Sequence, residues 1–200
     1  MSLLETNELL VKEHFGVSRA RNSYDIIDAE SGEKLGEAIE EATGLAMTFL
    51  KLTHWDSVVP FDIHFIEKET GVMLRIHRPW TFGRSKIKVF DSEDRLLGFF
   101  VQTFWFGKTK FKIKNARKEM IAKLTGNLFG WNFQFVDENN NLLASVGKKW
   151  IDLKKELLAG ADTYTVKIDS GRVPEGKHAL RILVLAAAVC VDMIYKQHER

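Results

Sequence analysis

Apolar and polar residues alternate in four segments of this 200-residue chain, which begin at Tyr24, Ile87, Phe111 and Phe133. Each segment ends in Asp or Asn, passes through a short polar turn and resumes with an apolar residue followed by a small one. A period of two is typical of half-buried strands. Asp and Asn begin turns because their side chains bond nearby backbone groups. Each unit therefore predicts a β-hairpin.

The spacing of the last three units predicts a regular antiparallel sheet. In each of them a small residue stands seven positions after the Asp or Asn: Gly98, Ala122 and Ala144. Further strands are expected at residues 8–15, 61–65, 72–78 and 164–168. Repeated hairpins favour an up-and-down sheet that closes on itself, because closure removes unpaired strand edges. The number of repeats by itself also fits a small propeller or a sandwich.

Residues 177–197 have a different pattern, since every residue from Ile182 to Val191 is apolar. This run is about half of the roughly 20 residues that cross a bilayer. A short helix that is apolar on all sides is typical of a buried core, with membrane insertion as the alternative. Neither a propeller nor a sandwich has room for such a helix at its centre. We therefore predict a mainly β fold of one domain, in which residues 8–197 form a closed antiparallel barrel around the helix 177–197 and residues 1–7 form a loose N-terminal end.

Three residues of the helix are expected to have structural roles: Arg181, Cys190 and Asp192. Arg181 and Asp192 are three helical turns apart and face nearly the same direction. An isolated buried carboxylate is costly, so we predict that Asp192 bonds a barrel residue near one rim. Cys190 is the single cysteine, and an apolar helix favours inert packing for it. A lone cysteine and a start without a signal-peptide pattern suit the cytoplasm.

The charges are unevenly distributed along the chain. Residues 1–70 contain 6 basic and 14 acidic side chains, whereas residues 71–200 contain 23 and 13. A basic half indicates an anionic partner, with a dipolar surface that binds nothing as the alternative. Strand alternation places cations of two segments on an outer face: Arg84, Lys86 and Lys88, and then Lys108, Lys110, Lys112 and Lys114. Each lysine near an anionic bilayer contributes about 1 kcal/mol, although lysines also keep strand exteriors soluble.

Signatures of enzymes are absent from the sequence. Gly107-Lys108-Thr109 lacks the leading glycine of a phosphate-binding loop, and no Gly-x-Ser-x-Gly occurs. The six histidines show no metal-ligand spacing. Lysines interleaved with aromatic residues could form a platform for single-stranded nucleic acid. The aromatic residues Trp80, Phe104, Trp105 and Phe106 instead gather at strand ends, which favours a membrane-interface belt or capping of the core.

Several motifs, in order, resemble those of one known family. They are Leu74-Arg75-Ile76-His77-Arg78-Pro79, Leu97 to Trp105, Lys110 to Asn115, Val146 to Trp150, and the helix with Val189-Cys190-Val191-Asp192. The chain resembles, from about Glu8 to Tyr195, the phospholipid scramblase family of the tubby C-terminal-like group, which also includes the plant LURP-one-related proteins. The resemblance implies a twelve-stranded barrel around a hydrophobic helix and contact with acidic phospholipids or phosphoinositides.

For scramblases the implied activity is calcium-dependent, energy-independent mixing of lipids between leaflets. The sequence differs from the animal scramblases in having no Pro-rich leader and no cysteine cluster for palmitoylation. In the segment that resembles their calcium site, only Asp162 keeps its acidic position, with Asp169 as a substitute. Calcium takes six to eight oxygen ligands, and two carboxylates supply too few. We therefore expect no cofactor, with calcium at Asp162 and Asp169 as the less favoured alternative.

The predicted function is a non-enzymatic, monomeric barrel that binds anionic phospholipid or phosphoinositide headgroups, as a peripheral protein on the inner face of a membrane. The residues expected to bind are Arg75, Arg78, Arg84, Lys86, Lys88, Lys110, Lys112 and Lys114. Two alternatives remain at this stage. The protein could move lipids between leaflets by inserting its helix, or it could be a scaffold for an unknown protein partner, with no lipid role.

Overall fold

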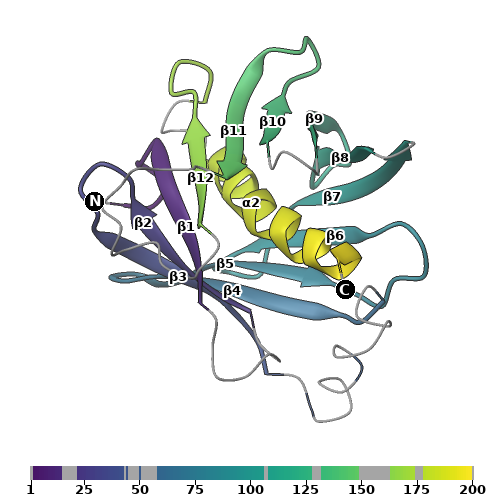
Figure 1. Ribbon diagram of the computed structural model, residues 1–200, viewed down its shortest axis with the longest axis horizontal. Coiled ribbons are helices and arrows are strands. Elements are labelled where there is room, and N and C mark those ends of the chain that lie inside the picture. Colours follow the sequence, from purple (N-terminus) through teal and green to yellow (C-terminus); the bar gives the residue numbers. More distant parts are fainter. Residues whose placement is uncertain are drawn as a thin grey trace.

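A computed structural model describes residues 2–14, 22–42, 44, 50, 58–105, 108–127, 132–148, 163–173 and 178–199. Twelve strands surround one long helix, α2, which runs through the middle of the molecule (Figure 1). The elements are β1 (Glu8–His14), β2 (Ser23–Asp28), β3 (Lys34–Glu40), β4 (Phe61–Glu67), β5 (Gly71–Arg78), β6 (Lys86–Asp91), β7 (Leu96–Trp105), β8 (Lys108–Asn115), β9 (Met120–Asn127), β10 (Asn132–Val136), β11 (Leu142–Lys148), β12 (Thr163–Ile168) and α2 (His178–Glu199).

The strands form one closed antiparallel barrel. Each strand pairs with its neighbours in the chain, and β1 closes the ring by pairing with β12, with Leu9 opposite Val166. This closure confirms the predicted barrel. The tight hairpin turns, such as residues 92–95 and 116–119, lie at one end, called here the turn end. The other connections, such as residues 79–85 between β5 and β6, lie at the opposite end, called here the loop end.

The repeated hairpins have the turn chemistry that the sequence predicts. The Oδ1 atom of Asp91 accepts hydrogen bonds from the backbone N–H groups of Glu93 (3.0 Å) and Arg95 (2.9 Å). In three hairpins the residue three positions after the Asp or Asn has a positive φ: Asp94 (59°), Lys118 (67°) and Asn140 (62°). The strand register shifts just before each of these turns. Such bulges bend the strands and so help to curve the sheet into a barrel.

The small residue of each repeat lies where the barrel wall is crowded. A Cβ atom on Gly98 would lie 2.3 Å from the carbonyl oxygen of Lys114 and 3.3 Å from Cδ2 of Leu183 on the helix. Ala122 and Ala144 are each 1% exposed. The spacing of seven residues therefore marks buried positions, and at Gly98 a larger side chain would collide with the neighbouring strand.

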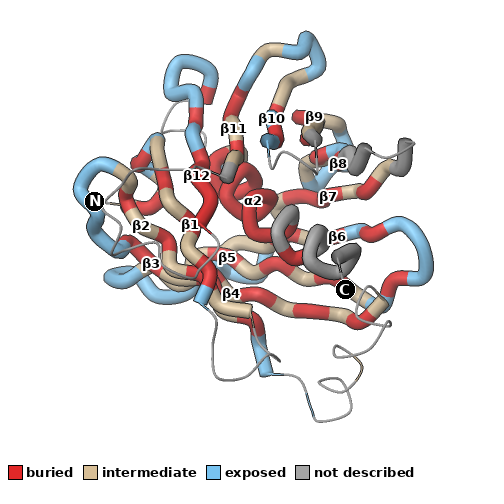
Figure 2. Tube along the Cα trace, in the orientation of Figure 1, coloured by how far each residue is buried: buried red, intermediate tan, exposed pale blue. Residues whose placement is uncertain are grey.

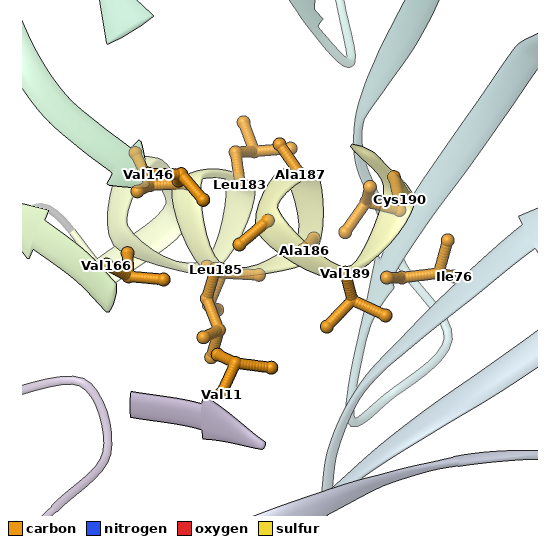
Figure 3. Packing of buried hydrophobic residues seen from close by; sticks show 14 of the residues in the cluster. Val11, Ile76, Val146, Val166, Leu183, Leu185, Ala186, Ala187, Val189 and Cys190 are labelled. Atoms are coloured by element: carbon orange, nitrogen blue, oxygen red, sulfur yellow. The ribbon is translucent and has the colours of Figure 1, made fainter. Parts of the chain in front are cut away.

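The helix is the centre of the core, as predicted. Its residues 182–190 are all buried, and Val11, Ile76, Val146 and Val166 approach it from different strands (Figure 3). In Figure 2 buried positions follow the central part of α2, and exposed positions gather at the turns. Each buried Leu or Val side chain stabilises the fold by about 1.5–3 kcal/mol. Within the described part of the chain, no helix combines the length and the apolarity needed to cross a membrane.

Arg181 and Cys190 of the helix are both buried. Arg181 is 1% exposed, and its guanidinium donates to the carbonyl oxygens of Val173 and Thr6, each at 2.9 Å. It thereby connects the first turn of α2 to the segment that precedes the helix and to the segment that precedes β1. Burial raises the pKa of the Cys190 thiol, so it stays protonated and unreactive. The side chain of Asp192 lies outside the described residues, so its pairing stays a prediction.

The N-terminal residues differ from the loose end that we expected. Leu3 is 2% exposed, and its backbone N–H donates to Oε1 of Glu67 at 2.7 Å. The backbone N–H of Ile168 donates to the carbonyl oxygen of Asn7 at 2.8 Å. Residues 2–7 therefore pack against the barrel, because an apolar residue and several backbone groups find partners there that are distant in sequence.

Candidate functional site

Five lysines lie on the outer face of strands β6, β8 and β9, a surface called here the lysine wall: Lys86, Lys88, Lys112, Lys114 and Lys123. Their chain neighbours Ile87, Val89, Phe111 and Ile113 are at most 4% exposed and face the core. Side chains alternate across a strand, so this apolar half of each strand places the lysines outside. Strand β7 lies between β6 and β8, so the five lysines share one continuous surface.

Phe99 of β7 lies in the middle of the lysine wall. It is opposite Lys88 on one side and Lys114 on the other. Although it is on the outer face, Phe99 is only 6% exposed, and the Nζ atom of Lys86 lies 4.6 Å from its ring centroid. Lysine stems can cover apolar surface while the ammonium group stays in water. The ring therefore gives the surrounding lysines an apolar base and holds Lys86 by a cation–π contact.

The lysine wall has no compensating acidic groups in the described part of the chain. None of the ion pairs found there includes any of the five lysines. Lys112 and Lys123 are directly opposite each other on β8 and β9. Like charges at opposite positions of an antiparallel pair destabilise it. A bound anion would remove that repulsion, so the arrangement favours an anionic ligand.

Arg78 does not belong to this surface, which corrects the sequence-based assignment. It is 2% exposed, its Nη2 atom donates to the carbonyl oxygen of Val59 at 2.6 Å, and its guanidinium lies 4.5 Å from the ring centroid of Phe61. Arg75 and Arg78 are an odd number of residues apart on one strand, so they face opposite sides of the sheet. Alternation alone could have excluded Arg78.

Arg75 is on the outer face but already has acidic partners. Its guanidinium lies 2.9 Å from Oδ1 of Asp62 and 2.5 Å from Oδ1 of Asp94, and it lies over the ring of Phe90 at 4.4 Å. Partial burial acts to lower the pKa of Arg75, but the hydrogen bonds to Asp94 and Asp62 outweigh it and raise the pKa. Arg75 therefore marks the edge of the lysine wall and adds no free charge to it.

The remaining predicted cations are divided. Arg84 is exposed in the connection between β5 and β6, two residues before Lys86. The backbone of Lys110 is opposite Thr103, but the Lys110 side chain lies outside the described residues. Sequence reasoning missed Lys123, although Ala122-Lys123-Leu124 has the same alternation as the neighbouring strands. Of the eight predicted cations, four lie on the lysine wall and a fifth, Arg84, is exposed beside it. Lys123 is the one cation of the wall that was not predicted.

Of the two predicted calcium residues, the structure describes Asp169 alone. Asp162 lies outside the described residues. The Oδ1 atom of Asp169 accepts the backbone N–H of Gly171 at 3.0 Å, and its Oδ2 lies 3.8 Å from Nε of Arg172. Asp169 thus serves the turn that leads toward α2. The described residues contain no cluster of three or more His, Cys, Asp or Glu side chains suited to a metal ion.

Comparison with known proteins identifies the family. A family model described as Scramblase matches residues 3–198. The chain belongs to the scramblase family. It is 19% identical to a phospholipid scramblase family protein of Schizosaccharomyces pombe, in an alignment that covers 78% of this chain and 42% of the relative. It is 21% identical to altered inheritance rate of mitochondria protein 25 of Saccharomyces cerevisiae, covering 90% of this chain and 65% of that relative.

The family match confirms the resemblance found in the sequence motifs. Scramblases are not a classical enzyme family, and membership indicates a lipid-related function. The chain spans less than two thirds of the length of either relative. The activity of those longer proteins therefore does not follow for this chain from the match alone.

Proposed function

We propose that the lysine wall binds the anionic headgroups of a phospholipid membrane, and that the protein is a non-enzymatic, peripheral lipid-binding barrel. The observation that carries this proposal is the set of five outward lysines that have no acidic partner among the described residues. Five lysines at about 1 kcal/mol each give an attraction of roughly 5 kcal/mol to an anionic surface. The cytoplasmic leaflet carries such a negative surface potential, which supports the proposal that the protein binds the inner face of a membrane.

The spacing of the lysine wall suits phosphate groups. The Cβ atoms of directly opposite residues such as Lys112 and Lys123 are roughly 4.5–5.5 Å apart in an antiparallel pair. Because the lysine stems are flexible, the two ammonium groups can approach a single phosphate from both sides. Lys86 stands two strands away from Lys112, a distance of roughly 10 Å, which allows a second phosphate or a neighbouring headgroup to bind. A headgroup with several phosphates, such as a phosphoinositide, would use both positions.

Co-sedimentation with liposomes tests this proposal. Neutral vesicles are compared with vesicles that contain phosphatidylserine or a phosphoinositide, at low and high salt and with and without calcium. We expect binding to the acidic vesicles alone, and we expect it to weaken with salt because ions screen exposed charges. In the triple variant Lys112→Gln/Lys114→Gln/Lys123→Gln, affinity should fall by about 100-fold, the equivalent of three lysine contributions.

The matched control removes three cations elsewhere: Lys34→Gln/Lys68→Gln/Lys167→Gln. It has the same net charge as the test variant, but Lys34 and Lys167 are paired with carboxylates in the native protein. Equal weakening in both variants would show that only net charge matters and would contradict a site at the lysine wall. Absence of binding to every vesicle would overturn the proposal and favour an acidic protein partner instead.

Movement of lipids between leaflets is a second candidate, which the family match and the name of the Schizosaccharomyces pombe relative favour. In the closed barrel, however, the apolar residues 182–190 of α2 are all in the core. To reach a bilayer the helix would have to leave twelve surrounding strands. Proteoliposomes with a fluorescent lipid, quenched from outside, test this candidate. We expect no transfer by the closed barrel, and transfer with or without calcium would show that the barrel opens.

A further inference from the structure

The connection between β5 and β6 exposes two aromatic side chains next to cationic ones. Trp80 is 48% exposed and Phe82 is 83% exposed, which makes Phe82 the most exposed large apolar residue of the described structure. Arg84 follows in the same connection and is also exposed, and Lys86 of the lysine wall comes two residues later. Exposed aromatic residues beside basic ones are typical of segments that enter the interface of an anionic membrane.

The backbone of the connection is held at Thr81 and at Ser85, while the side chains of Trp80 and Phe82 remain exposed. Between them Thr81 is buried, and its backbone N–H donates to the carbonyl oxygen of Val58 at 3.1 Å. At the end of the connection, the N–H of Ser85 donates to Oε1 of Gln102 at 3.1 Å, and the N–H of Gln102 donates to the carbonyl oxygen of Ser85 at 2.9 Å. Gly83 has a φ of 110°, which suits glycine and permits the bend after Phe82.

The acidic charge of the turn end gives the molecule a preferred orientation. The six turn segments at the turn end, residues 28–33, 67–70, 91–95, 115–119, 137–141 and 169–172, contain 12 acidic and 5 basic side chains. An anionic bilayer repels that end. Trp80, Phe82 and Arg84 lie at the opposite end, to which the C-terminal part of α2 also extends (Figure 1). Charge complementarity therefore points the loop end toward the bilayer.

From these observations we infer that Trp80 and Phe82 insert into the headgroup region of the anionic membrane that the lysine wall binds. This inference rests on the proposed function and adds an orientation to it. The lysine wall and Arg84 are attracted to the anionic membrane surface. The rings of Trp80 and Phe82 then enter the boundary between headgroups and acyl chains, so that the loop end of the barrel faces the bilayer. The partner of this exposed aromatic surface is therefore the headgroup region of a membrane.

A fluorescent label at residue 82 tests the insertion. Phe82→Cys can be labelled selectively with an environment-sensitive dye, because Cys190 is buried and unreactive. Upon addition of phosphatidylserine vesicles at low salt, we expect the emission to shift to the blue and to be quenched by brominated lipids. The same dye at Ser31→Cys, an exposed position at the turn end, should show neither change. Labelled Trp80→Cys repeats the test with Phe82 intact.

Affinity provides an independent measurement. Trp80→Ala/Phe82→Ala should weaken binding to acidic vesicles by about 10-fold while leaving its salt dependence unchanged, since the lost contribution is apolar. The matched control is Val72→Ala/Leu142→Ala, which removes two other exposed apolar side chains, 46% and 41% exposed, at the turn end. Its affinity should equal that of the wild type.

The outcomes separate the two proposals. Co-sedimentation of the labelled proteins without a spectral shift at either position 80 or 82 would overturn the insertion and leave binding by the lysine wall intact. A shift of equal size at residue 31 would overturn the proposed orientation. Failure of the unlabelled wild-type protein to sediment with acidic vesicles would overturn both proposals.

Discussion

Two walls of the same barrel use their charges in different ways. On the outer face of β1–β3 and β12, charges are paired: Asp25 contacts His14 and Lys34, Lys34 also contacts Glu37 at 3.0 Å, and Glu8 lies 3.0 Å from Lys167. We call this surface the ion-paired wall. The lysine wall, on β6, β8 and β9, has cations of the same kind with no carboxylate partner in the described structure.

The two walls differ in whether their lysine ammonium groups are available to an anionic ligand. Exposed ion pairs contribute about 0–1 kcal/mol to stability, so neither arrangement is decisive for folding. The charge of a paired ammonium, however, is largely neutralised by its carboxylate, so it attracts a phosphate less strongly than an unpaired ammonium does. The ion-paired wall is therefore expected to attract anions weakly and the lysine wall to attract them strongly. Three sets of substitutions test this difference between the two walls.

The largest effect is expected from Arg78, which the sequence places among the outer cations and the structure places inside. In Arg78→Gln the buried guanidinium that bonds Val59 is lost, and stability should fall by about 2–3 kcal/mol. Vesicle affinity should not change. The matched substitution Arg84→Gln, at an exposed position, should leave stability within about 0.5 kcal/mol of the wild type and weaken vesicle binding. Urea unfolding and co-sedimentation measure the two quantities, and a loss of affinity in folded Arg78→Gln would contradict the assignment.

An intermediate effect is expected from freeing cations on the ion-paired wall. Asp25→Asn/Glu37→Gln removes both carboxylates that contact Lys34. If availability decides binding, Lys34 should then add about 1 kcal/mol of attraction, an increase in affinity for acidic vesicles of roughly 5-fold at low salt. The control Glu30→Gln/Glu138→Gln changes the net charge equally at exposed turn positions whose carboxylates form no ion pair in the described structure. Equal increases in the two variants would mean that net charge, and not the freed lysine, accounts for the gain.

The smallest effect concerns acid stability. Partial burial acts to raise the pKa of Asp25, but its hydrogen bonds with Lys34 and His14 outweigh burial and lower the pKa. A lowered carboxyl pKa adds stability above the ordinary Asp value of about 3.9, and this stability is lost as the pH falls through the folded-state pKa. Wild-type protein should therefore lose up to about 0.5 kcal/mol more than Asp25→Asn between neutral pH and about pH 2.

Urea unfolding over that pH range measures the difference, with Glu138→Gln as an exposed control. The unfolding free energies of wild type and Asp25→Asn should differ by a constant amount above about pH 5 and converge below it. Parallel curves across the whole range would show that the contacts of Asp25 on the ion-paired wall do not stabilise the folded protein.

Much of the fold could be predicted because its rules are local. The alternation around Ile87 and Phe111 specifies which half of each strand is buried, and Asp91 and Asn115 bond their own turns within four residues. The apolar run from Ile182 to Val191 requires burial on every side, which a barrel can provide. Alternation also places Lys86, Lys88, Lys112 and Lys114 outside, and it would have found Lys123 and excluded Arg78 if applied to every strand.

Only the tertiary structure shows which charged side chains form ion pairs with one another. Strand register brings Arg75 within ion-pair distance of Asp62 and Asp94. Leu3 is buried beside Glu67. Lys112 is opposite Lys123 and forms no ion pair in the described structure. Charge pairing depends on contacts of a few ångströms between residues far apart in the chain, and one residue of register shift moves a side chain to the other face. The sequence alone was therefore enough to predict the barrel, its central helix and its outward lysines. The strand pairing of the closed sheet was needed to show which of those lysines are unpaired and available to an anion.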